Sequence, residues 1–345
     1  MMSQYIPRAD IIKPKRLIWA VELRKIIDAN KSKHALKNKV ISTRTKQFRE
    51  KALHQSFKEL RNDCNPKCKL DDPRNFREKH FKLLLKLWLS QELSPSTIQN
   101  KTSLFRVFCT WIGRPNMIKP LDLYVEDKAL VKRVQVATTD KSWTGNNLSY
   151  EDKLKEIDAY DSRAGAQLRI IKAFGLRREE AVCFQPRRAI KLGSPLNSIF
   201  VDRGTKNGLA RYIPIENDEQ RDALSHACNI AKNLDSHIGW EDKTLEKSIK
   251  RMANIMQKFK ITKKDAGTTL HGLRHEAMHN IYENITGHPC PVKGGKKEDI
   301  DPDLDLKARL LMTRAAGHAR LGITNAYAGS FKKSPPSEEK NNLGA

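Results

Sequence analysis

Apolar side chains recur at helical spacing through residues 74–112, and this periodicity constrains the fold of the chain more than any other feature. In 74–91 apolar residues fall three or four positions apart with basic residues between them, which is typical of an amphipathic helix. Ser94-Pro95 then indicates a second helix start, with serine as the cap and proline at the first position, and Gly113 indicates its end. The aromatic side chains keep the helical period, so we expect them to form a core rather than to stack on nucleic-acid bases. They are Phe76, Phe81, Trp88, Phe105, Phe108 and Trp111.

A polar segment, TTDKSWTGNNL at 138–148, has the composition of a linker and predicts a boundary between two domains. We expect a basic N-terminal extension over 1–44 and a helical domain over 45–137, with helices over 45–61, 74–91 and 121–136. After the linker, a second domain covers 149–331. A polar tail, predicted to be disordered, covers 332–345.

The second domain is predicted to be helical apart from one hairpin. A helix follows Ser149, another ends at Phe174-Gly175, and a short one starts at Arg178. Residues 198–202 and 210–215 have strand patterns, and Asn207-Gly208 between them is a strong hairpin-turn signal. The predicted fold class is therefore mainly α with a small antiparallel β-hairpin, an α+β arrangement.

The charge of the chain favours a polyanionic partner. It has 65 Lys+Arg against 40 Asp+Glu, a net charge of +25, and residues 1–140 alone hold 30 basic and 14 acidic side chains. Such an excess repels itself unless a partner neutralises it, so nucleic acid is the first expectation and an acidic membrane surface the second. Because no apolar run nears the ~20 residues of a membrane span, and because no secretory signal is evident and the six cysteines are scattered, we expect a cytoplasmic protein without a membrane partner.

Five separated features of the second domain carry groups suited to phosphate chemistry. Taken singly, each has an ordinary structural explanation, such as a helix ion pair, a lysine in a turn or a packed tyrosine. The features are Gly175-Leu176-Arg177 with Glu180, Lys206 beside the hairpin turn, His271-Gly272-Leu273-Arg274-His275, Gly317-His318, and Tyr327.

Together these residue types make up a set for phosphoryl transfer. Two guanidinium groups can hold the non-bridging oxygens of a phosphodiester. Imidazoles can donate to the same oxygens or move a proton, and a lysine can protonate a departing alkoxide. A tyrosine is a competent oxygen nucleophile once neighbouring positive charge favours its phenolate. The set needs no metal.

In this chain order the series resembles the catalytic signature of the tyrosine recombinases, the phage integrase family. The family's G-L-R-x-x-E is matched by Gly175 to Glu180, and its H-x-L-R-H box by His271 to His275. The family's hairpin lysine is matched by Lys206, and Tyr327 lies nine positions after His318, at the family's spacing. The segment LSPSTIQN with its aromatic-rich helix is similar to a core-binding domain. DKSW and Asn-Ala-Tyr-Ala-Gly are most similar to integrases of integrative and mobile elements.

The resemblance implies a role for each matched residue. Arg177 and Arg274 would hold the scissile phosphate, and Tyr327 would form a 3′-phosphotyrosyl link. His271 and His318 would assist, and Lys206 would be the general acid for the 5′-oxygen. Glu180 and His275 would be supporting residues. In the helical domain we expect DNA contacts from Lys46, Arg49, Lys101 and Arg106.

The resemblance also implies partners. They are double-stranded DNA and further copies of the chain, in a tetramer on paired DNA sites. A directionality factor is a further partner that the resemblance allows. The resemblance implies a metal- and ATP-independent DNA strand transferase without a cofactor, associated with the nucleoid. The segment 284–305 departs from the family pattern as an insertion between Arg274 and His318.

Two other functions compete with recombination. The first is a DNA-binding protein of the same fold that has lost catalysis. The second is a zinc peptidase, because His275-Glu276-Ala277-Met278-His279 matches H-E-x-x-H, which places two imidazoles on one helix face. No third histidine follows at the expected spacing, since Tyr282 and Ile285 occupy those positions.

Overall fold

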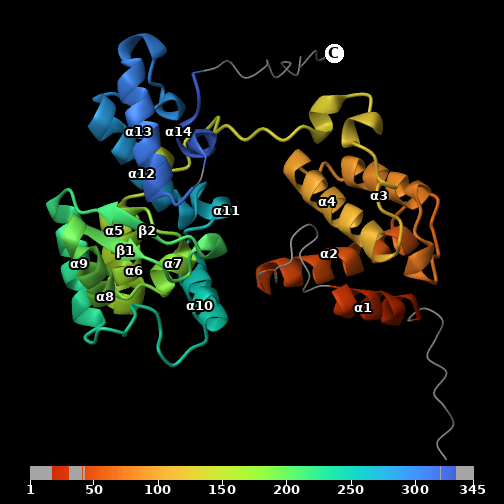
Figure 1. Ribbon diagram of the computed structural model, residues 1–345, viewed down its shortest axis with the longest axis horizontal. Coiled ribbons are helices and arrows are strands. Elements are labelled where there is room, and N and C mark those ends of the chain that lie inside the picture. The colour runs from red at the N-terminus through yellow and green to blue at the C-terminus, as the bar shows by residue number, and fades with distance from the viewer. Residues whose placement is uncertain (1–17, 31–40, 42, 319, 332–345) are drawn as a thin grey trace, which may run out of the picture. The chain divides into compact units, whose positions relative to one another are not determined.

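The computed structural model describes residues 18–30, 41, 43–318 and 320–331. The chain divides into two compact units, Met1–Val134 and Gln135–Ala345, and each is described by itself (Figure 1). The tail predicted over 332–345, and most of the extension predicted over 1–44, lie outside the described residues.

The first unit is a group of helices around an aromatic core. The predicted helices over 45–61 and 74–91 are confirmed as α2 and α3, and the Ser94 side chain caps α4 by accepting from the Thr97 amide at 3.3 Å. Phe76 and Phe105 stack with their ring centroids 5.0 Å apart, and both are buried. The aromatic stripe is thus a core, as predicted. The helices are α1 (Ile18–Asn30), α2 (Thr43–Asn62), α3 (Glu78–Ser90) and α4 (Pro95–Trp111).

Two features of the first unit differ from the sequence predictions. Helix α1 lies inside the predicted extension, yet Leu23 and Ile27 are fully buried in the core that α2, α3 and α4 share. The helix predicted over 121–136 is wrong, because only short 3-10 turns form at Leu121–Leu123 and Lys128–Val131. The Val131 carbonyl accepts from the Gln99 side chain at 2.7 Å, so packing against α4 replaces the hydrogen bonds of a continuous helix.

The second unit is helical with one two-stranded antiparallel sheet, which confirms the predicted fold class. Strand β1 (Ser198–Val201) pairs with β2 (Arg211–Pro214) in the register Ser198↔Pro214 to Val201↔Arg211. Figure 1 shows this hairpin among the helices of the unit, and β1 packs against α8. The helices are α5 (Tyr150–Tyr160), α6 (Ser162–Phe174), α7 (Arg178–Val182), α8 (Pro186–Gly193), α9 (Asp218–Ile230), α10 (Leu245–Lys258), α11 (Lys263–Ala266), α12 (His271–Thr286), α13 (Pro302–Ala315) and α14 (Asn325–Ala328).

The segment predicted as a linker, 138–148, packs on the second unit instead of bridging freely. Trp143 is fully buried and its indole N–H donates to the Thr269 carbonyl at 2.9 Å. Thr268 donates to the Lys141 carbonyl at 2.7 Å. A polar composition predicted exposure here, but one tryptophan and a few backbone contacts hold the segment against the start of α12.

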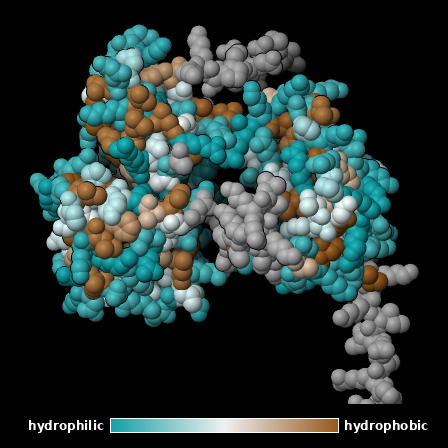
Figure 2. Space-filling model, viewed as in Figure 1, coloured by the Kyte–Doolittle hydropathy of each residue, from teal (hydrophilic) through white to brown (hydrophobic). Residues whose placement is uncertain are grey.

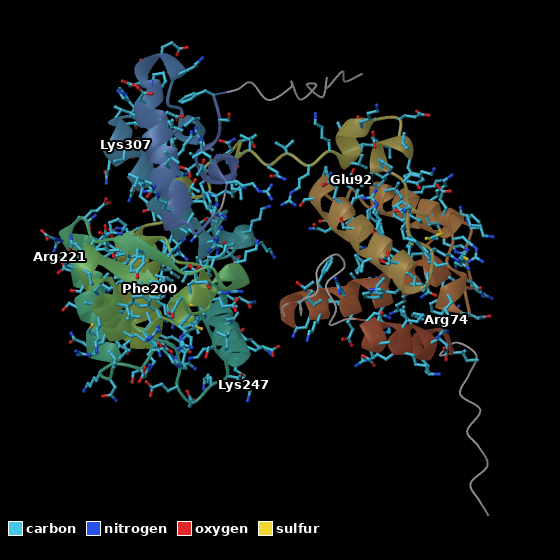
Figure 3. All side chains as sticks on the ribbon, in the orientation of Figure 1. Arg74, Glu92, Phe200, Arg221, Lys247 and Lys307 are labelled. Atoms are coloured by element: carbon cyan, nitrogen blue, oxygen red, sulfur yellow. The ribbon has the colours of Figure 1, made fainter. Side chains whose placement is uncertain are left out.

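Hydrophilic residues cover most of the visible face of each unit (Figure 2). Basic side chains such as Arg221, Lys247 and Lys307 extend outward from α9, α10 and α13 (Figure 3). Within the described ranges, no helix combines the length and the apolar character that crossing a bilayer requires.

Candidate active site

The first turns of α12 present three predicted site residues, because His271, Arg274 and His275 lie three and four positions apart and so share one face. Leu273 points to the core and is fully buried. At Gly272 no side chain fits, since a Cβ atom would lie 2.6 Å from the Lys141 carbonyl oxygen. The glycine therefore lets the segment before α5 approach the start of α12 and fix its position.

Arg274 is fully buried and connects three distant parts of the unit. Its Nε donates to the Tyr327 hydroxyl at 3.0 Å, and its Nη2 donates to the Ala316 carbonyl at 2.7 Å. Its Nη1 donates to the carbonyl of Gly175, which ends α6 with a φ of +62°. A buried guanidinium with three acceptors is held in a single orientation.

Arg177 faces the same carbonyl as Arg274. It caps the start of α7, and its Nη2 donates to the Ala316 oxygen at 2.7 Å. Its Nη1 and its own amide both donate to Glu180 at 2.8 Å. The structure thus brings the two predicted arginines together around one oxygen atom.

Arg211, which the sequence analysis missed, completes this network. Its Nη1 and Nη2 donate to the two Glu180 carboxylate oxygens at 2.9 and 2.8 Å, and its Nε donates to the Ala315 carbonyl at 2.8 Å. Burial opposes ionisation of Glu180, but the Arg211 guanidinium, followed by Arg177, outweighs it and lowers the pKa of Glu180 to about 2. The strand alternation carried a signal, because Arg211 shares the inward face of β2 with Ile213.

Tyr327, on α14, lies among histidines. Its side chain is buried, and the ring centroids of His275, His318 and His271 lie 5.0, 6.0 and 6.2 Å from that of Tyr327. His318 Nε2 is 3.4 Å from the Tyr327 hydroxyl.

The imidazoles of the site favour their neutral form. Desolvation, and then the charges of Arg177 and Arg274, lower the pKa of His318 to about 4. Desolvation of the imidazole and then Arg274 likewise lower the pKa of His271 to about 4, although the residue as a whole is exposed. Desolvation and then His271 lower the pKa of His275 to about 3. At neutral pH these rings can accept a proton.

Lys206 is exposed, on the 3-10 turn Lys206–Gly208 between the two strands. Its charge is a minor contribution to the lowered pKa of His318, after desolvation and the charges of Arg177 and Arg274. Gly208 has a φ of +70°, as the Asn-Gly signal predicts, but the connection runs from 202 to 210 and is longer than a two-residue turn.

The residues of the H-E-x-x-H match have other contacts. Glu276 accepts from the Thr144 amide at 3.1 Å, and His279 Nε2 is 3.0 Å from the Tyr327 carbonyl oxygen. In the part of the chain that the structure describes, no group of three or more His, Cys, Asp or Glu side chains is arranged to hold a metal ion.

The residues predicted to contact DNA lie on α2 and α4 of the first unit, and three have internal contacts. Arg49 is buried, with its guanidinium 5.4 Å from the centroid of Trp111. Lys101 pairs with Glu59 at 3.3 Å, and Arg106 donates to the Lys119 carbonyl at 2.6 Å. Lys46 is half-buried.

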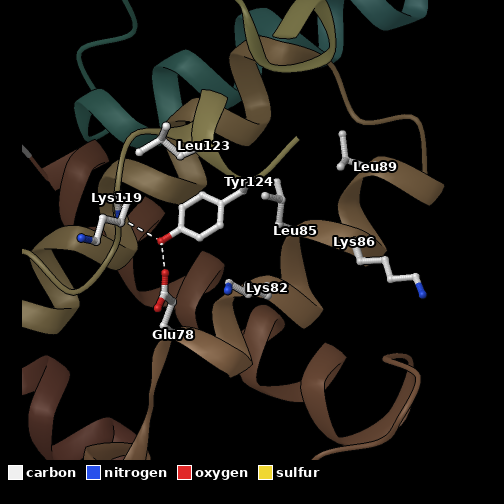
Figure 4. A pocket seen from close by; sticks show the side chains of 8 residues that line it. All are labelled: Glu78, Lys82, Leu85, Lys86, Leu89, Lys119, Leu123 and Tyr124. Atoms are coloured by element: carbon white, nitrogen blue, oxygen red, sulfur yellow. Dashed lines mark hydrogen bonds between the residues drawn. The ribbon is translucent and has the colours of Figure 1, made fainter. Parts of the chain in front are cut away.

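A pocket of about 580 Å³ also lies in the first unit, between α3 and the segment that follows α4 (Figure 4). Lys82, Lys86 and Lys119 line it together with leucines. Tyr124 is fixed there because its hydroxyl donates to Glu78 at 2.7 Å and accepts from the Lys119 amide at 2.9 Å. None of the predicted catalytic residues lines this pocket.

Comparisons with known proteins agree with this fold. A family model described as Integrase matches residues 131–281. The search of curated proteins found no match. The fold is similar to that of a Tn1549 transposon integrase fragment in complex with transposon right-end DNA, at 14% identity and a TM-score of 0.53, covering 92% of this chain and 95% of that chain. It is also similar to a lambda integrase fragment, a dimer bound to a COC′ core site, at 12% identity and a TM-score of 0.55, covering 93% and 99% of the two chains.

Proposed function

We propose that the chain is a tyrosine recombinase of the integrase family, a site-specific recombinase that cleaves and rejoins DNA through a phosphotyrosine at Tyr327. The Integrase family model over residues 131–281 and the similarity of the fold to two integrases support this proposal. The observation that carries this proposal is the meeting of Tyr327 with Arg274, 3.0 Å apart, beside Arg177. A buried tyrosine bonded to one guanidinium, with a second guanidinium on the same carbonyl, is suited to attack on a phosphate.

The proposed step is a displacement at phosphorus. The Tyr327 oxygen forms a bond to the scissile phosphorus while the bond to the 5′-oxygen breaks. The phenolic proton passes to a neutral imidazole, and His318 Nε2 at 3.4 Å is the candidate acceptor. Arg177 and Arg274 hold the non-bridging oxygens, with support from His271, and Lys206 protonates the departing 5′-oxygen.

The remaining residues of the site support these groups. Glu180 fixes Arg177, and His275 packs against the Tyr327 ring. One phosphoester replaces another, so the step is nearly balanced in free energy and needs no ATP. The 5′-hydroxyl of another strand can reverse it. The arginines supply the charge stabilisation that a metal supplies in other phosphoryl transferases.

Duplex DNA is the proposed partner. The net charge of +25 supports it, and the similar integrases described above are complexes with DNA. Recombination exchanges four strands, each requiring one tyrosine, so we propose a tetramer on two paired sites. The protein would act on cytoplasmic, nucleoid-associated DNA.

A nicked suicide substrate tests the proposal, because loss of the short fragment beyond the nick traps the covalent complex. The parent protein should form an adduct that survives denaturation, whereas Tyr327→Phe should bind the same DNA and form none. An adduct in Tyr327→Phe would remove that residue from the role. DNA binding without any adduct in the parent would favour the inactive DNA-binding protein, and chelator-sensitive peptide cleavage would favour the zinc peptidase.

A further inference from the structure

The main chain around Tyr327 is held from three directions. The Asn325 carbonyl accepts from the Ala137 amide at 2.8 Å. Arg309 of α13 donates to the Asn325 side chain at 2.8 Å and to the Gly329 carbonyl at 3.3 Å. His279 of α12 reaches the Tyr327 carbonyl at 3.0 Å. A helix of four residues cannot fix its own orientation, so these bonds determine where the phenol points.

His279 is the most direct of these contacts. A carbonyl only accepts hydrogen bonds, so His279 Nε2 must carry the proton that is shared with Tyr327. The ring is 1% exposed, and its Nδ1 has no hydrogen-bond partner but lies 3.7 Å from an Asp140 carboxylate oxygen. His279 thus lies between the nucleophile's backbone and the segment that follows the first unit.

Asp140 is fixed in turn. Its carboxylate accepts from the Ser142 amide at 2.8 Å, and Gly145 packs so closely that a Cβ there would lie 2.2 Å from Asp140 Oδ2. Ala137 and Asp140 both belong to residues 137–147, which we call the connector because it follows directly on the first unit. The connector therefore binds the nucleophile segment directly at Asn325, and its Asp140 lies beside His279.

Resting on the proposed function, we propose that His279 is a positioning residue whose hydrogen bond to the Tyr327 carbonyl holds the main chain of Tyr327 in the orientation needed for attack. His279 does not touch the phenolic oxygen or the arginine pair in any contact described above, so it is not a catalytic residue. Its loss should misplace the phenol and leave the phosphate-binding arginines intact. A misplacement of ~1 Å can cost about 100-fold in rate.

A matched pair of substitutions tests this role. His279→Met keeps buried volume without a donor, whereas His279→Gln keeps an amide donor at similar reach. Covalent complex formation is measured in single turnover on the nicked substrate at saturating DNA, beside the Kd for the same DNA. We expect His279→Met to react about 10- to 100-fold more slowly with an unchanged Kd, and His279→Gln to recover most of the rate. His226→Gln on α9 is the control and should react like the parent.

Several results would overturn the role. They are a parent-like rate in His279→Met, equal losses in the Met and Gln variants, or a loss confined to the Kd. A substrate with a better 5′ leaving group should not rescue His279→Met, and rescue would make His279 an acid rather than a positioning residue. If His279→Met does not fold, His279→Leu carries the same test, with the same loss of rate expected and a parent-like rate contradicting the proposal. Lack of any adduct in the parent would instead refute the proposed function.

Discussion

Substitution of Glu180 should lower the stability of the second unit by an amount that can be measured, because Glu180 binds both Arg211 and Arg177. Glu180 is fully buried and binds Arg211 and Arg177, so Glu180→Gln leaves the Arg211 guanidinium without its counter-charge. The ordinary pKa of 4.5 falls to about 2 in the folded state. Since one pKa unit corresponds to about 1.4 kcal/mol, the ionised carboxylate contributes roughly 3 kcal/mol. Breaking one side of a buried ion pair costs a similar amount, about 3–5 kcal/mol.

The sign of the pH dependence follows from the direction of the shift. A carboxylate whose pKa is lower in the folded than in the unfolded state stabilises the folded state. For Glu180 this stabilisation is fully present above the unfolded pKa of 4.5 and is lost as the pH falls toward the folded pKa of about 2. The free energy of unfolding of the parent should therefore exceed that of Glu180→Gln by roughly 3 kcal/mol at pH 7. The difference should shrink below pH 4.5.

Urea unfolding of the full chain, followed by Trp143 and Trp240 in the second unit, measures this difference. Tryptophans of the first unit are replaced by phenylalanine in both proteins, so that the signal reports one unit. The control is Glu219→Gln, which breaks the half-exposed pair with Lys172 and should cost less than about 1 kcal/mol. Equal stability of the parent and Glu180→Gln at pH 7, or a difference that stays constant down to pH 3, would refute the reasoning.

Three further predictions concern the chemistry. Arg274→Ala should lower the single-turnover rate by several orders of magnitude, because Arg274 contacts both Tyr327 and the shared carbonyl; near-normal cleavage would count against its role. Lys206→Ala should recover activity on a DNA with a better 5′ leaving group, and failure to recover would argue against general-acid duty. DNA affinity should fall steeply with salt, with a log–log slope of about −0.9 per phosphate neutralised; a flat response in a salt titration would contradict binding by basic side chains.

The sequence predicted those parts of the fold that depend on interactions between residues close together in the chain. The helix starts at Ser94 and Ser149 and the helix end at Gly175 depend on neighbouring residues, and the structure has all three. The helix expected over 121–136 failed because its stability depends on packing against α4, which local pattern does not encode. The burial of 138–148 escaped prediction for the same reason, since the Thr269 carbonyl that the Trp143 indole binds lies more than a hundred positions away.

In the site, too, the features set by residues close in sequence were predictable and those set by distant residues were not. His271, Arg274 and His275 share a helix face, so their spacing in the sequence already brings them together. Arg211 and His279 have no such spacing relative to Tyr327 or Glu180, and the fold alone brings them close. Motifs thus indicated the groups proposed to act on a phosphate, together with the supporting residues Glu180 and His275, whereas the contacts of Arg211 and His279 with them became visible only in the structure.

The charge balance of the site favours an anionic ligand. Arg177, Arg211 and Arg274 converge on one carboxylate, Glu180, and on the carbonyls of Gly175, Ala315 and Ala316. Carbonyl dipoles orient the guanidiniums but do not neutralise them, so positive charge remains in excess and helps keep His271 and His318 neutral. A phosphodiester would offset that excess and raise the pKa of both imidazoles, making them better proton acceptors. Substrate binding itself would therefore prepare the histidines to take the phenolic proton.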